Sequence, residues 1–335
     1  MLVAGATLLL SSTAQAAEIT GAGSTFFYPV ASKWAEVYKA KTGVGLNYQS
    51  IGSGGGIAQI RAKTVTFGAS DKPLTPAEAE SAGLVQFPVV IGGDVAVVNL
   101  PGIKSGEMVL DGPTLANIYL GHIKVWNDPA IKKLNPKLNL PSQAIAVVHR
   151  SDGSGTTFIW ANYLSKVSPE WAANVGAATS LEWPVGIGAK GNEGVAGNVA
   201  QTSGAIGYVE YAYATQNHLL VARAINKDGV TVSPSAASFQ AAAAKADWVN
   251  AKDFYVILTQ QAGHDAWPIT GSVFVLVYRQ PPDPAAEKEA LKFFQWAFAD
   301  GKEIAASLNY VPMPESAVQA VEKSWHEKIA PAALP

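Results

Sequence analysis

The chain has 335 residues, and its 24 Lys and Arg nearly balance its 26 Asp and Glu, which gives a formal net charge of −2. The absence of cysteine excludes disulfides, thiolate metal sites and cysteine nucleophiles, and the near-neutral charge argues against a nucleic-acid groove, which needs a basic surface. A hydrophobic content of 48% is too high for a disordered chain, and the length fits roughly two domains.

The first 16 residues, MLVAGATLLLSSTAQA, have the pattern of a secretory signal peptide. An apolar run over residues 2–10 precedes small polar residues and an A-x-A site at 14–16, so cleavage is expected after about Ala16. A short buried N-terminal helix is the alternative. No other segment approaches the roughly 20 apolar residues that a membrane-spanning helix needs. We therefore expect a protein that is released into a bacterial periplasm.

Hydrophobic periodicity predicts alternating helices and strands along the rest of the chain. Val30, Trp34 and Val37 recur at helical spacing and Gly43 follows as a stop, so residues 29–41 should form a helix. The segments that follow are strand 45–51, helix 57–63, strand 66–70, one or two buried strands in 88–100, strand 144–149, helix 157–167, strands 205–213 and 272–278, and helices 291–298 and 317–329. This alternation predicts α/β layers with mostly parallel sheets.

Three turns rich in glycine and hydroxyl residues, at 21–26, 52–56 and 150–156, each precede a predicted helix. The start of a helix leaves backbone N–H groups unpaired at the positive end of its dipole, glycines let that backbone approach a ligand, and hydroxyls add donors. One such turn is usually an ordinary N-cap. Three of them, with Arg150 in the last, favour an anion site, because a guanidinium is a planar fork that fits an oxyanion.

Two other kinds of site lack their motifs. The phosphate-loop pattern G-x-x-x-x-G-K-[ST] is absent from these turns, and so is the G-x-S-x-G elbow of serine hydrolases. The five histidines are scattered without an i, i+4 pair, which favours packing or surface roles over metal binding or catalysis. A secreted phosphatase or other hydrolase that uses Ser53 or Ser154 stays open as an alternative, although no base is visible beside either serine.

Asp71 directly follows the strand predicted at 66–70, where a turn or cap residue is common. In an anion site it has a sharper meaning, because a carboxylate accepts a hydrogen bond only from a protonated oxyanion. Phosphate keeps a proton at neutral pH, whereas sulfate does not. A carboxylate within a ring of donors would therefore admit phosphate and reject sulfate, since two unpaired negative charges would face each other.

These motifs resemble those of the periplasmic phosphate-binding proteins that serve bacterial phosphate-specific ABC transporters. The matching stretches are GAGSTF at 21–26, YQSIGSGGG at 48–56, FGASDKPL at 67–74, FPVVIGG at 87–93, SGEMVLDGPTLANIYLG at 105–121, KLNPKLNLPSQAIAVVHRSDGSGTTF at 133–158, GAIGYVEYAYA at 204–214 and DAWPIT at 265–270. The resemblance covers essentially the whole mature chain. It implies an α/β periplasmic-binding-protein fold of type II, with two hinged domains and a ligand cleft between them. One domain would hold residues 17–92 and 264–335, and the other residues 93–263.

The resemblance also implies the binding residues, which are Thr25, Phe26, Ser53, Asp71, Arg150, Ser154, Gly155 and Thr156, with Asp152 in support. Thr25 would supply a hydroxyl, Phe26 a backbone N–H, Ser53 both, and Arg150 charged hydrogen bonds. Residues 154–156 would form the third donor turn, Asp71 would accept the phosphate proton, and Asp152 would pair with the arginine.

The function that the resemblance implies is to bind inorganic phosphate in the periplasm and deliver it to an inner-membrane ABC permease with a cytoplasmic ATPase. The protein would then be a monomer and not an enzyme, without cofactor, metal or nucleic acid. A surface protein that scavenges phosphate without a permease would use the same pocket, so that reading also stays open.

Overall fold

The computed structural model describes residues 18–335, so the signal peptide predicted at 1–16 lies outside the described residues. A ten-stranded sheet forms the centre, with strand order β2-β1-β3-β12-β4-β8-β6-β7, and β13 and β9 also pair with β4. The strands are β1 Ile19–Gly23, β2 Leu46–Ser50, β3 Phe67–Ser70, β4 Leu84–Val98, β5 Val109–Leu110, β6 Ala146–Arg150, β7 Ile187–Ala189, β8 Ala205–Glu210, β9 Leu220–Val221, β10 Arg223–Ile225, β11 Thr231–Val232, β12 Thr270–Tyr278 and β13 Val311–Pro312. A small separate sheet has the order β11-β10-β5.

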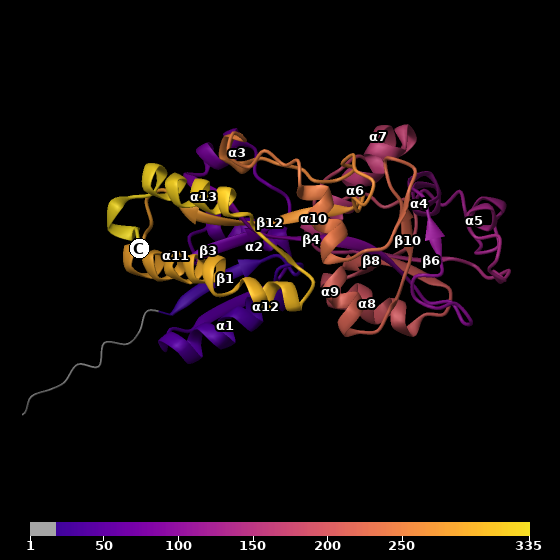
Figure 1. Cartoon of the computed structure of the whole chain (residues 1–335), viewed down its shortest axis with the longest axis horizontal. Helices are drawn as coiled ribbons and strands as arrows, with labels where there is room; N and C mark the ends of the chain where they lie inside the picture. Colours follow the sequence, from indigo (N-terminus) through magenta and orange to yellow (C-terminus); the bar gives the residue numbers. More distant parts are fainter. Residues whose placement is uncertain (1–17) are drawn as a thin grey trace, which may run out of the picture.

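Helices cover the sheet at both ends of the molecule (Figure 1). They are α1 Tyr28–Thr42, α2 Ser53–Arg61, α3 Pro76–Ser81, α4 Gly112–Tyr119, α5 Pro129–Leu134, α6 Gly155–Val167, α7 Pro169–Asn174, α8 Gly191–Gln201, α9 Tyr211–Gln216, α10 Ala236–Ala243, α11 Pro284–Ala299, α12 Lys302–Ser307 and α13 Glu315–Lys328, with short 3₁₀ turns at η1 Lys252–Phe254 and η2 Pro331–Ala333. No helix within residues 18–335 is long and apolar enough to span a bilayer.

Two lobes share one long strand, β4 (Figure 1). Residues 84–93 of β4 pair with β12, and residues 94–98 pair with β8. All 15 residues of β4 are buried. We call the part around β1, β2, β3 and β12, with α1–α3 and α11–α13, the first lobe, and the part around β6, β7 and β8, with α4–α9, the second lobe. The chain thus has the two-lobed α/β architecture of a periplasmic-binding-protein fold.

The exact domain boundaries, at 92/93 and 263/264, stay a prediction. The segment around η1 falls within the predicted second domain, and it contacts the first lobe. Lys328 on α13 donates a hydrogen bond from Nζ to Asp253 Oδ1 at 2.7 Å, and Gln86 Nε2 donates to the Asp253 carbonyl at 2.8 Å.

The predicted elements are confirmed in type, although the helix predicted at 291–298 begins already at Pro284, and three further corrections follow. The helix predicted at 57–63 begins at Ser53, so its glycines are helical. The start of this helix can pack closely on β1 because residue 56 is a glycine. A Cβ there would lie 2.5 Å from Gly23 Cα and 2.6 Å from the Ala22 carbonyl oxygen of that strand. The strand predicted at 205–213 ends at Glu210, because the Glu210 carboxylate caps α9 by accepting from Ala212 N–H at 2.7 Å.

The third correction concerns strand direction. β1 runs parallel to β2 and β3, and β6 runs parallel to β7 and β8, as the helix–strand alternation predicts. The central pairs are antiparallel, because β12 lies antiparallel to both β3 and β4, and β4 lies antiparallel to β8. The expectation of mostly parallel sheets is therefore wrong at the centre, where strands from distant parts of the sequence meet.

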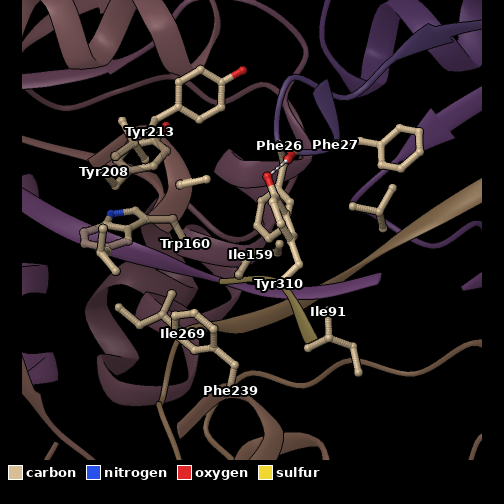
Figure 2. Packing of buried hydrophobic residues seen from close by; sticks show 14 of the residues in the cluster. Phe26, Phe27, Ile91, Ile159, Trp160, Tyr208, Tyr213, Phe239, Ile269 and Tyr310 are labelled. Atoms are coloured by element: carbon tan, nitrogen blue, oxygen red, sulfur yellow. Dashed lines mark hydrogen bonds between the residues drawn. The ribbon is translucent and has the colours of Figure 1, made fainter. Parts of the chain in front are cut away.

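Aromatic packing fixes the loop between β1 and α1, which is the first of the three turns. Phe26 and Phe27 have 0% of their surface exposed. Figure 2 shows the Tyr310 ring beside Phe26, with the Tyr310 hydroxyl directed at the Phe26 carbonyl, to which it donates at 2.7 Å. Burial of side chains of this size is worth about 1.5–3 kcal/mol each. Packing of Phe26 and Phe27 in the hydrophobic core therefore fixes the position of this turn.

Candidate functional site

The three glycine-hydroxyl turns meet where the lobes face each other. The turns before α1 and α2 belong to the first lobe, and the turn before α6 belongs to the second. Ser53 Oγ accepts from Gly155 N–H at 3.1 Å, and Gly54 N–H donates to the Gly153 carbonyl at 2.8 Å, so two turns touch across the lobes. The eight predicted binding residues are buried, with 3% or less of the surface of Arg150 or Thr25 exposed, and the supporting Asp152 is half-buried. The structure therefore brings the predicted residues together.

Hydrogen bonds hold the first and third turns in shape, and one of them comes from the other lobe. In the first turn, Ser24 Oγ accepts from Phe27 N–H at 3.1 Å, and the Thr25 carbonyl accepts from the Tyr213 hydroxyl at 2.7 Å. In the third turn, Ser154 is the N-cap of α6 and its Oγ accepts from Thr157 N–H at 3.0 Å. Ser154 thus acts as a helix cap, whereas Ser24 braces the turn ahead of α1, which has no side-chain cap.

Arg150 ends β6 and forms a two-pronged ion pair with Asp152. Arg150 Nε lies 2.7 Å from Asp152 Oδ1, Nη2 lies 2.5 Å from Oδ2, and Nη1 lies 3.3 Å from Thr156 Oγ1. Burial raises the pKa of Asp152, but the hydrogen bonds and charge of Arg150 outweigh it and leave that pKa below its usual value. The fork is thereby neutralised on one side and fixed in orientation, as the predicted pairing requires.

Asp71 lies among these donors with 2% of its surface exposed. Ser24 Oγ donates to its Oδ1, and Ser53 Oγ lies 3.5 Å from its Oδ2. Burial raises the pKa of Asp71 to about 7, and the hydrogen bond from Ser24 and the charge of Arg150 offset part of that rise. The carboxyl can thus change its protonation state near neutral pH, in the middle of a set of hydrogen-bond donors.

Known proteins match the chain over nearly its whole length. Residues 11–301 match the model of the PBP superfamily domain. The phosphate-binding protein PstS of Pasteurella multocida is 54% identical over 317 residues, which is 95% of this chain and 92% of that protein. The PstS of Haemophilus influenzae is 51% identical over 316 residues, 94% of this chain and 95% of that protein.

The chain belongs to the PstS family of phosphate-binding proteins. This is a family of substrate-binding proteins and not of enzymes. Among solved structures, a high-affinity periplasmic phosphate-binding protein, PfluDING, with bound phosphate has a TM-score of 0.73 at 21% identity, and the match covers 92% of this chain and 93% of that one. At that identity the likeness shows the fold alone, and the fold agrees with the two lobes described above.

For a member of the PstS family, the surroundings of the two candidate serines correct one expectation. No base was expected near Ser53, yet Asp71 lies 3.5 Å from its Oγ. Asp71 also accepts from Ser24, and no histidine of residues 18–335 hydrogen-bonds to Ser53 or Ser154. Residues 18–335 also hold no group of three or more His, Asp and Glu arranged to bind a metal.

Sequence reasoning missed four polar residues of this region. Ser24 contacts Asp71, Asn192 contacts the two threonines, and Asp94 and Glu210 are fully buried and occupy paired positions of the β4–β8 ladder. Burial raises the pKa of Asp94 and of Glu210 well above the usual range. Two of them carried a signal that could have been read: Ser24 lies inside the first predicted turn at 21–26, and Gly191 and Asn192 start a helix directly after β7, as the other donor turns do after their strands.

Proposed function

We propose that this chain binds inorganic phosphate between its lobes and delivers it to an ABC-type phosphate importer. The observation that carries the proposal is the meeting of three donor turns and one buried arginine around one buried carboxyl, Asp71. The relatives named above are phosphate-binding proteins, and their similarity extends over almost the entire chain.

The proposed roles follow from the donor chemistry of each residue. Hydroxyls of Thr25, Ser53, Ser154 and Thr156, the Arg150 fork, and backbone N–H groups of Phe26 and Ser53 would donate to the phosphate oxygens. In the third turn, Ser154 N–H donates to the Thr179 carbonyl at 2.8 Å and Gly155 N–H to Ser53 Oγ at 3.1 Å, so this turn would contribute its hydroxyls and the close approach that Gly155 allows. These dipoles act in a dry, low-dielectric cleft, so they hold an anion without an excess of net positive charge. Asp71 would accept the proton that phosphate carries, and Asp152 would keep the empty arginine balanced.

Delivery would depend on movement of the lobes. Closure about β4 would bring the turn before α6 onto the turns before α1 and α2, and the closed shape would be recognised by the inner-membrane permease, which works with a cytoplasmic ATPase. We place the protein in the periplasm as a monomer after cleavage following about Ala16, with domains at 17–92 plus 264–335 and at 93–263.

Calorimetry on the mature protein, stripped of ligand, tests the binding. We expect sub-micromolar affinity for phosphate and no detectable binding of sulfate. Absence of phosphate binding would reject the proposed function, whereas equal affinities for both anions would reject only the role of Asp71. Turnover of a chromogenic phosphate ester that is lost in Ser154→Ala would instead favour the secreted phosphatase.

The partner needs its own test. We expect the chain to restore phosphate uptake in cells that keep a phosphate permease and ATPase but lack their own binding protein. Tight binding of phosphate without restored uptake would favour a scavenging protein that acts without a permease.

A further inference from the structure

Asn192 connects the two halves of the proposed site. It lies in the first turn of α8, in the second lobe, and 0% of its surface is exposed. Its Nδ2 lies 2.7 Å from Thr25 Oγ1 in the first lobe and 3.2 Å from Thr156 Oγ1 in the second. The Asn192 backbone N–H also donates to Thr25 Oγ1, at 3.2 Å. One side chain therefore contacts both threonine hydroxyls that the proposed function assigns to phosphate.

The orientation of the Asn192 amide is determined by its neighbours. Its Oδ1 accepts from Glu210 N–H at 2.9 Å. A backbone N–H can only donate, so the amide oxygen must face Glu210 and the NH₂ group must face the threonines. Glu210 is itself held in the ladder, where it is paired with Asp94 across β4 and β8.

Counting hydrogen bonds shows what remains free on each threonine. A hydroxyl can accept two hydrogen bonds and donate one. Thr25 Oγ1 accepts from both the backbone N–H and the NH₂ group of Asn192. Thr156 Oγ1 accepts from Arg150 Nη1 at 3.3 Å and from Asn192 Nδ2. Every one of these partners is a donor without acceptor capacity, so each hydroxyl has only its proton left to offer.

We propose that Asn192 is a positioning residue that turns Thr25 and Thr156 into obligate hydrogen-bond donors toward the ligand. The inference rests on the proposed phosphate function. It explains how two hydroxyls, which could equally accept, are committed to an anion and present no lone pair to it. A ligand that offers a donor at these positions finds no acceptor on either threonine, so Asn192 adds specificity without touching the ligand.

Substitution of Asn192 tests this polarity by calorimetry with inorganic phosphate. Asn192→Ala removes one of the two donors from each hydroxyl, because the backbone N–H of residue 192 stays on Thr25 and Arg150 Nη1 stays on Thr156. One lone pair on each hydroxyl is then free, and we expect affinity to fall about tenfold or more, since hydrogen bonds to charged groups are the strong ones. Asn192→Asp places acceptors where the NH₂ group was and draws the threonine protons away from the ligand, so we expect at least a further tenfold loss. Asn198→Ala on the same helix is the matched control, because Asn198 Nδ2 donates only to the Gly194 carbonyl, at 2.8 Å.

A double-mutant cycle that combines Asn192→Ala with Thr25→Val separates this role from simple support of the fold. Because neither substitution adds a charge, the cycle is also free of the charge effect of Asn192→Asp. Asn192→Ala should weaken binding less in a Thr25→Val background than in the wild type, because the hydroxyl that Asn192 orients is gone. A merely structural residue would give additive losses. The thermal midpoints of the ligand-free proteins are measured alongside, and Asn192→Ser replaces Asn192→Ala in the cycle if the latter does not fold.

Each outcome decides something. If the wild type does not bind phosphate, both the proposed function and this inference fall. If the wild type binds and Asn192→Ala binds equally well, only the inference falls. Additive losses in the cycle, or an Asn192→Asp protein that binds no more weakly than Asn192→Ala, would also overturn it.

Discussion

Replacement of Gly155 by alanine tests whether the two lobes must touch for phosphate to bind. Gly155 is the first residue of α6 in the second lobe. A Cβ at this position would lie 2.6 Å from Asp71 Cβ, from Asp71 Oδ2 and from Ser53 Oγ. Both of these residues belong to the first lobe. The three nearest atoms to the added methyl group therefore all belong to the opposite face of the proposed cleft. The methyl group would act as a wedge between the lobes.

The cost of the wedge follows from these contacts. Overpacking of a tight interior typically costs about 1–3 kcal/mol. The hydrogen bond from Gly155 N–H to Ser53 Oγ, now 3.1 Å long, would also be lost, which removes about 0.5–1.5 kcal/mol. Together these effects amount to about 1.5–4.5 kcal/mol, which corresponds to roughly 10- to 2000-fold weaker phosphate binding. The fold itself should be unaffected, because alanine suits a helix better than glycine does.

Calorimetry with phosphate on Gly155→Ala gives the comparison, and Gly197→Ala is the matched control. Gly197 lies within α8 of the same lobe, and a Cβ there would meet nothing within 4 Å. We expect wild-type affinity for the control. Wild-type affinity in Gly155→Ala, or an equal loss in both variants, would refute the view that contact between these turns is needed for binding.

Three further expectations concern the charged groups of the site. Asp71→Asn should reduce the preference for phosphate over sulfate by about 10- to 100-fold, since one hydrogen bond to a charged group is worth about 1.5–3 kcal/mol; an unchanged ratio in calorimetry would show that Asp71 is not the selector. Because Asp71 has a pKa of about 7 when folded and about 3.9 when unfolded, the folded protein holds a proton there between pH 4 and 7 that the unfolded chain has released. The free energy of unfolding of ligand-free protein should therefore fall as pH rises through this window, by up to about 4 kcal/mol, and urea titrations should find that component of the slope missing in Asp71→Asn, while Asp94 and Glu210 retain theirs. Arg150→Lys should weaken phosphate binding at least tenfold, because loss of one hydrogen bond to a charged group costs about 1.5–3 kcal/mol and an ammonium cannot bond to Asp152 with two nitrogens and still offer a planar pair of donors to the ligand. Wild-type affinity would contradict the role assigned to the guanidinium.

The turns were predictable from the sequence because their chemistry is local. A hydroxyl or glycine before a helix is a property of a few consecutive residues, and Ser154 caps α6 as its position in the sequence suggests. The start of α2 was not predictable, because glycine disfavours helices. Only the close approach of Gly56 to β1 shows why glycine is needed inside that helix.

The rest of the site depends on contacts between residues far apart in sequence. Asn192 and Thr25 are 167 residues apart, and nothing near Asn192 in the sequence identifies its partner. The same holds for the antiparallel centre of the sheet, since β12 pairs with β3 and β4 although the whole second lobe lies between them in the sequence. Local periodicity predicts that strands exist, whereas their neighbours and directions are decided by tertiary pairing.

The continuous strand β4 has a consequence for the thermodynamics of ligand capture. If a flexible linker joined the two lobes, the half-sites would sample many relative positions, and ligand binding would be weakened by the entropy lost in bringing them together. A buried strand that forms ladders in both lobes holds the half-sites at a high effective concentration. Most of the conformational entropy of the two half-sites is then already lost when the protein folds. A small anion with few atoms can therefore retain most of its interaction energy as affinity.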